Sequence, residues 1–334
     1  MFSSIKQETL HLPTLQPPIN YFPVSLNPFS FKTGLIKLSG TPKGHEQNIF
    51  QIDSEWSHYR QEKLKSRKER LSKYVTRKGL DKNIENRACS YIVETLTKQH
   101  PTLFTLHKES QKQVLHNTLS GESIEFDNYF NILNSSKPIE PAYENLLDAL
   151  CCQLQEDLSI IHITEQHDKL VYLHLCFPNY WSAESKIGKC FSGAHKYVPA
   201  METINKNSEK LNKLLKTEGP FERFTWGITT DKRLNHHPNP SENIDQDTWY
   251  GRQFSPDSPL YLRIERQVTA PFSKESAYMF SIRTYFVDLR KANGEQLRRL
   301  ITSIETMSEN ILKYKGLAEN KELLIKRLSQ LAGE

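Results

Sequence analysis

The chain has 334 residues, 37% of them hydrophobic and 25% charged, so it is long enough to bury a sizeable core. Its 44 basic and 39 acidic residues leave a net charge of +5, and it lacks an arginine-rich arm, which argues against a nucleic-acid partner. No apolar run reaches about 18 residues and no basic start precedes an apolar stretch, so we expect neither a membrane span nor a secretory signal.

The first part of the chain predicts an extended segment, a short strand and two helices. Prolines within residues 1–30 favour an extended segment that packs along a domain. Residues 34–38 predict the strand, and helical periodicity predicts helices over 55–71 and 83–99. The basic run at 63–74 lies at the end of the first helix, and we interpret it as a solvated face.

The middle of the chain predicts one long helix and then strands interrupted by helices. Leucines at helical spacing make 141–158 the strongest predicted helix. The runs 160–163 and 170–177 predict two strands joined by a turn. A further helix is expected over 204–217 and a strand over 224–228.

The last part of the chain contains the clearest strand pattern. After the loop-rich segment 231–259, two strand-like runs within 260–289 flank the connection 270–276. From Gly294 onward we expect one or two helices. Helices thus come first, antiparallel strands follow, and helices interrupt them, so we predict an α+β fold, one domain wrapped by terminal segments.

Polar and apolar side chains alternate along the first of these two strands. Because successive side chains point to opposite faces, Arg263, Glu265 and Gln267 share one face of Leu262–Gln267. Two interpretations stay open. This face is either the wet side of a surface strand or the lining of a polar pocket beside an apolar partner strand.

The cysteines and the missing nucleotide motifs limit which cofactor sites the sequence predicts. Five cysteines without a CxxC pair favour buried free thiols in a reducing cytoplasm, and they supply no zinc or iron–sulfur ligand set. Neither GxGxxG nor GxxxxGK[ST] occurs, so no nucleotide site is predicted. The cysteines are Cys89, Cys151, Cys152, Cys176 and Cys190.

Histidines are the candidates for metal ligation. His195 lies between a glycine break and the Val198-Pro199 stop in a segment with few charges, where a neutral imidazole suits a metal or a haem iron. Neither HExxH nor a GxSxG elbow occurs, which disfavours a zinc protease and a serine hydrolase. The other candidates are adjacent loop histidines and a possible cross-strand pair: His236, His237, His162 and His174.

Several segments occur in the order typical of one known family. They are GLIKL (34–38), IDSEWSHYRQEKLKSRKERL (52–71), LQEDL (154–158), LCFPNYWSAESKIGK (175–189), AHKYVP (194–199), FERFTWGITTD (221–231), LRIERQV (262–268) and FSIRTYFVDL (280–289). Over roughly residues 20–295 the chain resembles the alpha subunit of haem-dependent oxidative N-demethylase. It departs from the family pattern at 268–272, which lacks a leucine–arginine-rich connection, and at Tyr197, where the family has proline.

The resemblance implies a fold, a cofactor and a reaction. It implies a PAS-like antiparallel core holding haem b, over 31–293, between the extended segment 1–30 and a C-terminal helical segment, 294–334. It implies a cytoplasmic monooxygenase that uses O2 to demethylate a small secondary amine such as dimethylamine, releasing formaldehyde. Electrons would come from separate reductase subunits carrying flavin and 2Fe–2S, which agrees with the missing nucleotide and cluster motifs.

The resemblance also suggests roles for individual residues. His195 is expected to be the axial haem ligand, with His236 or His237 as the fallback, and Glu265 to attract the dialkylammonium substrate. The planar guanidinium group of an arginine suits the carboxylate of a haem propionate. Arg266 has a second possible role, in a structural ion pair within the protein. The remaining candidates are Gln267 and Tyr285 for the substrate and Arg263, Arg266 and Arg283 for the propionates.

Two rival classes share every motif quoted. A PAS-like core that binds haem or another ligand without catalysis would be a sensor. A protein that uses the same fold without haem would be an interaction scaffold. A visible spectrum separates the scaffold from the other two, and formaldehyde release separates an enzyme from a sensor.

Overall fold

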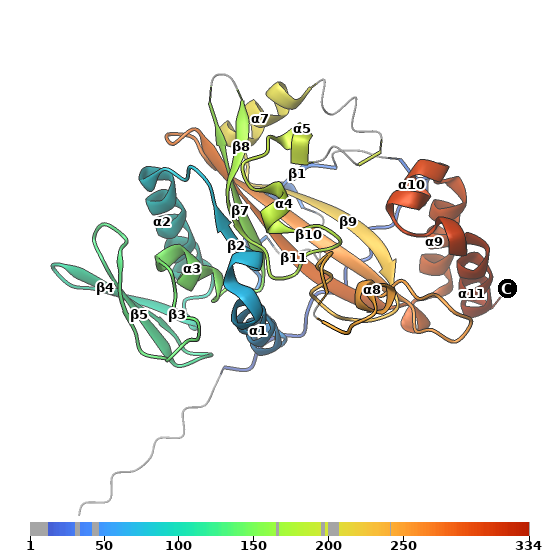
Figure 1. Cartoon of the computed structure of the whole chain (residues 1–334), viewed down its shortest axis with the longest axis horizontal. Helices are drawn as coiled ribbons and strands as arrows, with labels where there is room; N and C mark the ends of the chain where they lie inside the picture. The colour runs from blue at the N-terminus through green and yellow to red at the C-terminus, as the bar shows by residue number, and fades with distance from the viewer. Residues whose placement is uncertain are drawn as a thin grey trace, which may run out of the picture.

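The computed structural model describes residues 13–30, 34–41, 47–164, 167–194, 198–199, 207–240 and 242–333. These residues form two antiparallel sheets with helices packed on them (Figure 1), which confirms the predicted α+β class. Among them is no helix with the length and apolar character needed to cross a bilayer.

Seven strands form the central sheet, in the spatial order β1-β9-β10-β11-β7-β8-β2. β10 and β11 are its longest strands and pair along all 12 residues of each, joined by a short turn. The strands are β1 (Ile36–Lys37), β2 (Val75–Arg77), β7 (Asp157–Ile163), β8 (Asp168–His174), β9 (Phe221–Thr229), β10 (Tyr261–Phe272) and β11 (Ala277–Asp288).

Helices cover both faces of this sheet (Figure 1). α2 and α3 pack on one face, α4, α5 and α7 lie over the other, and the last three helices gather at the β9 edge. The helices are α1 (Trp56–Tyr74), α2 (Lys82–Gln99), α3 (Leu146–Cys151), α4 (Ala183–Lys186), α5 (Phe191–Ala194), α7 (Ser208–Thr217), α8 (Gln246–Tyr250), α9 (Gly294–Thr306), α10 (Glu309–Tyr314) and α11 (Lys321–Ala332).

A second sheet of four strands is not among the predicted elements. Its strands are only four to six residues long, and one face is polar, so the alternating pattern is weak. Leu115, Ile124 and Phe126 on its buried face pack into the same core as α2. The strands are β3 (Phe104–Lys108), β4 (Lys112–Asn117), β5 (Glu122–Asp127) and β6 (Ile132–Ser135).

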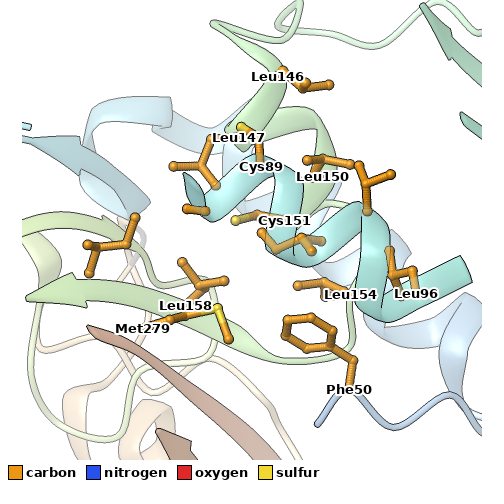
Figure 2. Packing of buried hydrophobic residues seen from close by; sticks show 14 of the residues in the cluster. Phe50, Cys89, Leu96, Leu146, Leu147, Leu150, Cys151, Leu154, Leu158 and Met279 are labelled. Carbon is orange, nitrogen blue, oxygen red and sulfur yellow. The ribbon is translucent and has the colours of Figure 1, made fainter. Parts of the chain in front are cut away.

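The main apolar core lies between the central sheet, α2 and α3. Figure 2 shows Leu147, Leu150 and Leu154 gathered with side chains of α2 above Leu158 of β7. The predicted helix over 141–158 is wrong in extent. α3 begins after its N-cap Asn145 and ends at Cys151, because the next residues form buried side-chain hydrogen bonds with other segments. The leucine spacing therefore continues from a helix into a strand.

The interpretation of the basic run of α1 as a solvated face holds for only half of its cations: Lys65, Lys68 and Arg70 are exposed, whereas Lys63, Arg67 and Lys73 are buried. Lys63 donates from Nζ to the carbonyl oxygens of Cys151 and Glu156, and Arg67 forms a two-pronged ion pair with Asp148. These cations attach α1 to the segment between α3 and β7. They therefore do not form a free basic patch for a partner protein.

The two ends of the described chain meet on the same side of the sheet. Tyr21 and Val24, within a stretch that contains neither helix nor strand, pack into one apolar cluster with Leu262 and Ile264. Helices α9 and α11 complete this cluster, and a capping box between Asn293 and Gln296 begins α9. Three α-helices follow Gly294, where one or two were expected.

Candidate active site

A cavity of about 400 Å³ lies against the face of the central sheet opposite α2 and α3. Its volume falls within the roughly 300–1,000 Å³ that is usual for ligand sites. Residues of β7 to β11 form one wall, and residues of α4, α5, α7 and α10 cover it. Most of the lining is apolar, including Ile161, Leu170, Leu173, Trp181, Leu211, Leu215, Phe280 and Ile282.

The polar face predicted for β10 lines this cavity. Arg263, Glu265 and Gln267 all contribute to the wall, with Arg263 and Glu265 only 2% and 8% exposed. Of the two interpretations left open, the polar pocket is therefore the one that the structure supports. Gln267 donates from Nε2 to Glu265 Oε2 over 2.9 Å, which orients the carboxylate.

Two cations from outside β10 share the electrostatic environment of Glu265. Burial lowers the pKa of Lys315 to about 8, and the negative charge of Glu265 opposes this shift. Burial likewise lowers the pKa of Arg223, again opposed by Glu265. Lys315 Nζ donates to the Trp226 carbonyl oxygen over 2.6 Å and lies 4.6 Å from the Trp226 ring centroid.

The cavity has more cations than carboxylates. Five cationic side chains line it, against the two carboxylates of Asp168 and Glu265. None of the five forms an ion pair with any carboxylate that the structure describes. The space therefore suits a ligand that carries negative charge. The cations are Lys186, Arg223, Arg252, Arg263 and Lys315.

Arg263 is mainly a backbone clamp. Its Nη1 donates to the carbonyl oxygens of Arg233 and Leu234, each over 3.0 Å. Its Nη2 donates to the carbonyl oxygens of Phe177 and Pro178, over 2.9 and 3.4 Å. These contacts hold two loops against β10. They occupy most of the donors that a propionate would need, which weakens the predicted role of Arg263 in haem binding.

Arg252, which was not predicted, lies in an aromatic stack beside the cavity. Its guanidinium carbon is 3.5 Å from the centroid of the Tyr180 ring, which also stacks on His236 at 5.6 Å and contacts Tyr250 edge-on at 5.1 Å. The close approach of Arg252 to the chain requires Gly316, because a Cβ there would lie 2.5 Å from Arg252 Nε. That Nε is buried and has no hydrogen-bond partner among the described residues.

Tyr285 and Arg283 were predicted to contact substrate and haem, but the structure places them away from the cavity. Tyr285 pairs across the sheet with Ile264, and so lies on the opposite face from Glu265. Its hydroxyl donates to Gln51 Oε1. Arg283 lies on the same opposite face and forms a 2.9 Å ion pair with Asp53.

Arg266 also lies on that opposite face. Its Nε forms an ion pair with Glu222, and both side chains are buried. Of the two roles considered for Arg266, the structure shows the structural ion pair. The alternation along β10 had already separated Arg266 from Glu265.

His195 lies outside the described residues. Its chain neighbours Ala194 and Val198 both line the cavity. The fallback ligands His236 and His237 are fully buried but are not part of the lining. Burial lowers the pKa of His236 to about 4, opposed by a hydrogen bond from its Nε2 to Asp231 Oδ1 at 3.1 Å.

The strand histidines do not form the cross-strand pair that was considered. His162 faces Lys169 across β8, whereas His174 faces Leu158. His174 instead lies in two buried groups of potential ligands, in each of which the ligand atoms lie within 4.8 Å of one another. Arg67 occupies the carboxylate of Asp148 there, and its positive charge opposes binding of a metal cation. The groups are Asp148, Cys152, His174 and Asp157, His174, Cys176.

A comparison with known protein families agrees with the resemblance described from the quoted segments. The family model described as haem-dependent oxidative N-demethylase, alpha subunit-like, matches residues 40–325, nearly the whole chain. The matched range contains every strand of β2 to β11 and each cavity residue named above. The chain belongs to the haem-dependent oxidative N-demethylase, alpha subunit-like family.

Proposed function

We propose that the protein is a haem b-dependent monooxygenase that removes an N-methyl group from a small secondary amine, for which dimethylamine is the simplest candidate. One oxygen atom of O2 enters a C–H bond of the methyl group, and the other leaves as water with two electrons and two protons. The resulting carbinolamine breaks down to formaldehyde and the shorter amine. Family membership supports an oxidative N-demethylase, and the cavity supports the rest of the proposal.

The cavity fits a haem in its surface chemistry, and this observation carries the proposal. A porphyrin is flat and apolar with two carboxylates at one edge. The cavity offers apolar walls and an excess of cations, and the buried Nε atoms of Arg223 and Arg252 have no partner among the described residues. Buried donors without partners are costly, so they indicate an acceptor that a ligand supplies.

The PAS-like core belongs to the same proposal. The first hairpin of the central sheet, β7 with β8, lies beside the last strand, β11, and the cavity helices are inserted between β8 and β9. This arrangement leaves one sheet face free to hold a ligand under the inserted helices. His195 would ligate the iron through one ring nitrogen, a role favoured by the cavity position of Ala194 and Val198.

The chain's own residues would bind the amine and keep water out. Haem, when bound, supplies the activation of O2. Glu265 would accept a hydrogen bond from the substrate ammonium, and Gln267 would hold the carboxylate in place. The aromatic and aliphatic lining excludes water from the N-methyl group, which strengthens the attraction between the ammonium and Glu265.

Electrons would come from separate cytoplasmic reductase subunits that carry flavin and a 2Fe–2S cluster. The description of the family as alpha subunit-like supports a multi-subunit oxygenase. All five cysteines are free, and none forms a four-thiolate cluster site within the described chain.

Haem content and formaldehyde release test the proposal. The purified protein should show a Soret band at one haem per chain, and His195→Ala should lose or shift that band while remaining folded by circular dichroism. His162→Ala is the matched control, because His162 is a strand histidine outside the cavity lining. An unchanged Soret band in His195→Ala would eliminate His195 as the ligand.

With dimethylamine, O2 and a chemical or protein reductant, one formaldehyde should form for each amine consumed. Haem at full occupancy without formaldehyde would favour the sensor. A folded protein that takes up no haem would exclude both the enzyme and the haem sensor and would favour the interaction scaffold.

A further inference from the structure

Arg223 and Glu265 place opposite charges on neighbouring strands of the cavity wall. β9 and β10 are antiparallel, with Gln267 opposite Arg223 and Glu265 opposite Thr225. Arg223 and Glu265 are therefore diagonal neighbours on one face, a relation in which the backbones lie about 7–8 Å apart. Both side chains line the cavity.

These two charges form no ion pair with each other, although the charge of Glu265 opposes the effect of burial on the pKa of Arg223. No ion pair joins Arg223 to Glu265, and neither has another ionic partner in the part of the chain that the structure describes. Arg223 Nε is buried without a hydrogen-bond partner, although the side chain is at the cavity wall. Because Arg283 Nε on the closed face is equally unpartnered, the position of Arg223 at the cavity wall without an ion pair is what points to a ligand carboxylate, which a guanidinium can bind through two parallel hydrogen bonds.

A bound haem leaves this arginine available. Lys186 of α4, which donates to the Ala194 carbonyl oxygen, and Arg252, which stacks on Tyr180, are two lining cations outside the sheet, and we assign the two propionates to them. Lys315 already donates to the Trp226 carbonyl and lies over the Trp226 ring, and Arg263 is engaged by four carbonyls. Of the three cations that interact with the charge of Glu265, Arg223 is the one that donates to no carbonyl or carboxylate oxygen among the described residues.

We infer that the substrate is an N-methylated amino acid, whose ammonium binds Glu265 and whose carboxylate binds Arg223. The inference rests on the proposed function and names its substrate class. An amino acid carries its two charges a few bonds apart, and the wall presents the complementary pair on adjacent strands. Dimethylamine would satisfy Glu265 alone and leave Arg223 buried with no counter-charge.

A pair of ligands that differ only in the carboxylate tests this directly. Binding of N-methylglycine and N-methylglycinamide is measured by calorimetry and by the change in the Soret band of the haem-loaded protein. We expect N-methylglycine to bind about 10–100-fold more tightly, the usual effect of a charge-assisted hydrogen-bonded pair. Arg223→Gln should abolish that preference, and Arg223→Lys should retain part of it.

Arg290→Gln is the matched control, because Arg290 is a surface arginine paired with Asp288. Haem content is measured for every variant. If Arg223→Gln loses haem while the ligand preference survives in the haem that remains, Arg223 binds a propionate and the inference is wrong. Equal affinity of the parent protein for the two ligands, or preference for the amide, would also overturn it.

The same measurements separate this inference from the proposed function. If the protein takes up haem and releases formaldehyde from dimethylamine but neither binds nor demethylates N-methylglycine, the inference fails and the proposed function stands. If the protein takes up no haem, the proposed function fails. Calorimetry on the haem-free protein still tests whether Arg223 and Glu265 bind N-methylglycine. Tight binding of N-methylglycine that depends on Arg223 would then support an amino-acid site without haem chemistry.

Discussion

The two faces of the central sheet hold buried arginines in opposite ways. On the face under α2 and α3, Arg266 pairs with Glu222 and Arg283 pairs with Asp53. On the cavity face, Arg223 has no ionic partner among the described residues. Since a buried charge is costly unless it is paired, the ion pairs of the first face lie within the chain, whereas our proposal completes the second face with a ligand.

This contrast separates structural charges from functional ones without reference to residue type. The closed face has Arg266 of β10 and Arg283 of β11, and the cavity face has Arg223 of β9 and Arg263 of β10. Arg223 is partly exposed and the other three are buried, and only the two on the closed face have ionic partners among the described residues. The comparison therefore yields predictions in which the same chemical change has different results on the two faces.

The largest effect is expected from breaking an ion pair on the closed face. Arg266→Met leaves Glu222 buried without its cation, and such a loss costs about 3–5 kcal/mol. Urea unfolding followed by circular dichroism measures the free energy of unfolding. A loss below about 1 kcal/mol would mean that this pair adds nothing and that the two faces are alike. Arg290→Met, at an exposed ion pair, is the control and should change stability little.

The next effect concerns binding rather than folding. Glu265→Gln keeps the shape of the side chain but removes the charge, so affinity for the amine should fall about 10–100-fold. Stability should fall modestly, because Glu265 makes no direct ion pair in the described chain but its charge opposes the effect of burial on the pKa values of Lys315 and Arg223. Calorimetric titration with the amine measures the change. Glu275→Gln, in the turn between β10 and β11 and outside the cavity lining, is the control. Unchanged affinity in Glu265→Gln would remove the carboxylate from the site.

The alternation along β10 was sufficient to predict which of its residues share a face. It grouped Arg263, Glu265 and Gln267 correctly, because the period of a strand is two and this strand has no bulge. The alternation could not show whether this polar face contacts solvent or lines a pocket. That choice depends on α4 and α7, which lie far from β10 in the sequence and cover its polar face.

The errors have a common physical origin. Tyr285 and Arg283 were selected because they follow a recognised motif, but β11 pairs in a register that turns them to the closed face. Arg223 was within a quoted segment, and the alternation of β9 would have shown its face only once β9 was known to pair with β10. Lys315 comes from a C-terminal helix, and no local pattern indicated that it reaches the cavity.

A pH-dependent effect should distinguish the cavity lysine from a surface lysine. Burial lowers the pKa of Lys315 to about 8, below the usual value near 10.4, so the unfolded chain binds more protons between these values. The free energy of unfolding should therefore rise as the pH increases from about 8 to about 10. Lys315→Met should remove this rise, and Lys313→Met, at an exposed lysine of α10, should retain it. Unfolding by urea at several pH values tests this, and equal slopes in both variants would contradict it.

The smallest effect is expected from the same arginine-to-methionine change on the cavity face. Arg223→Met removes a buried charge that has no ionic partner in the described chain, and methionine retains most of the apolar stem. The free energy of unfolding of the ligand-free protein should stay within about 0.5 kcal/mol of the parent value or rise. Urea unfolding beside Arg266→Met makes the comparison direct. A loss of about 2 kcal/mol or more would mean that Arg223 is held within the chain, and the cavity face would then need no ligand.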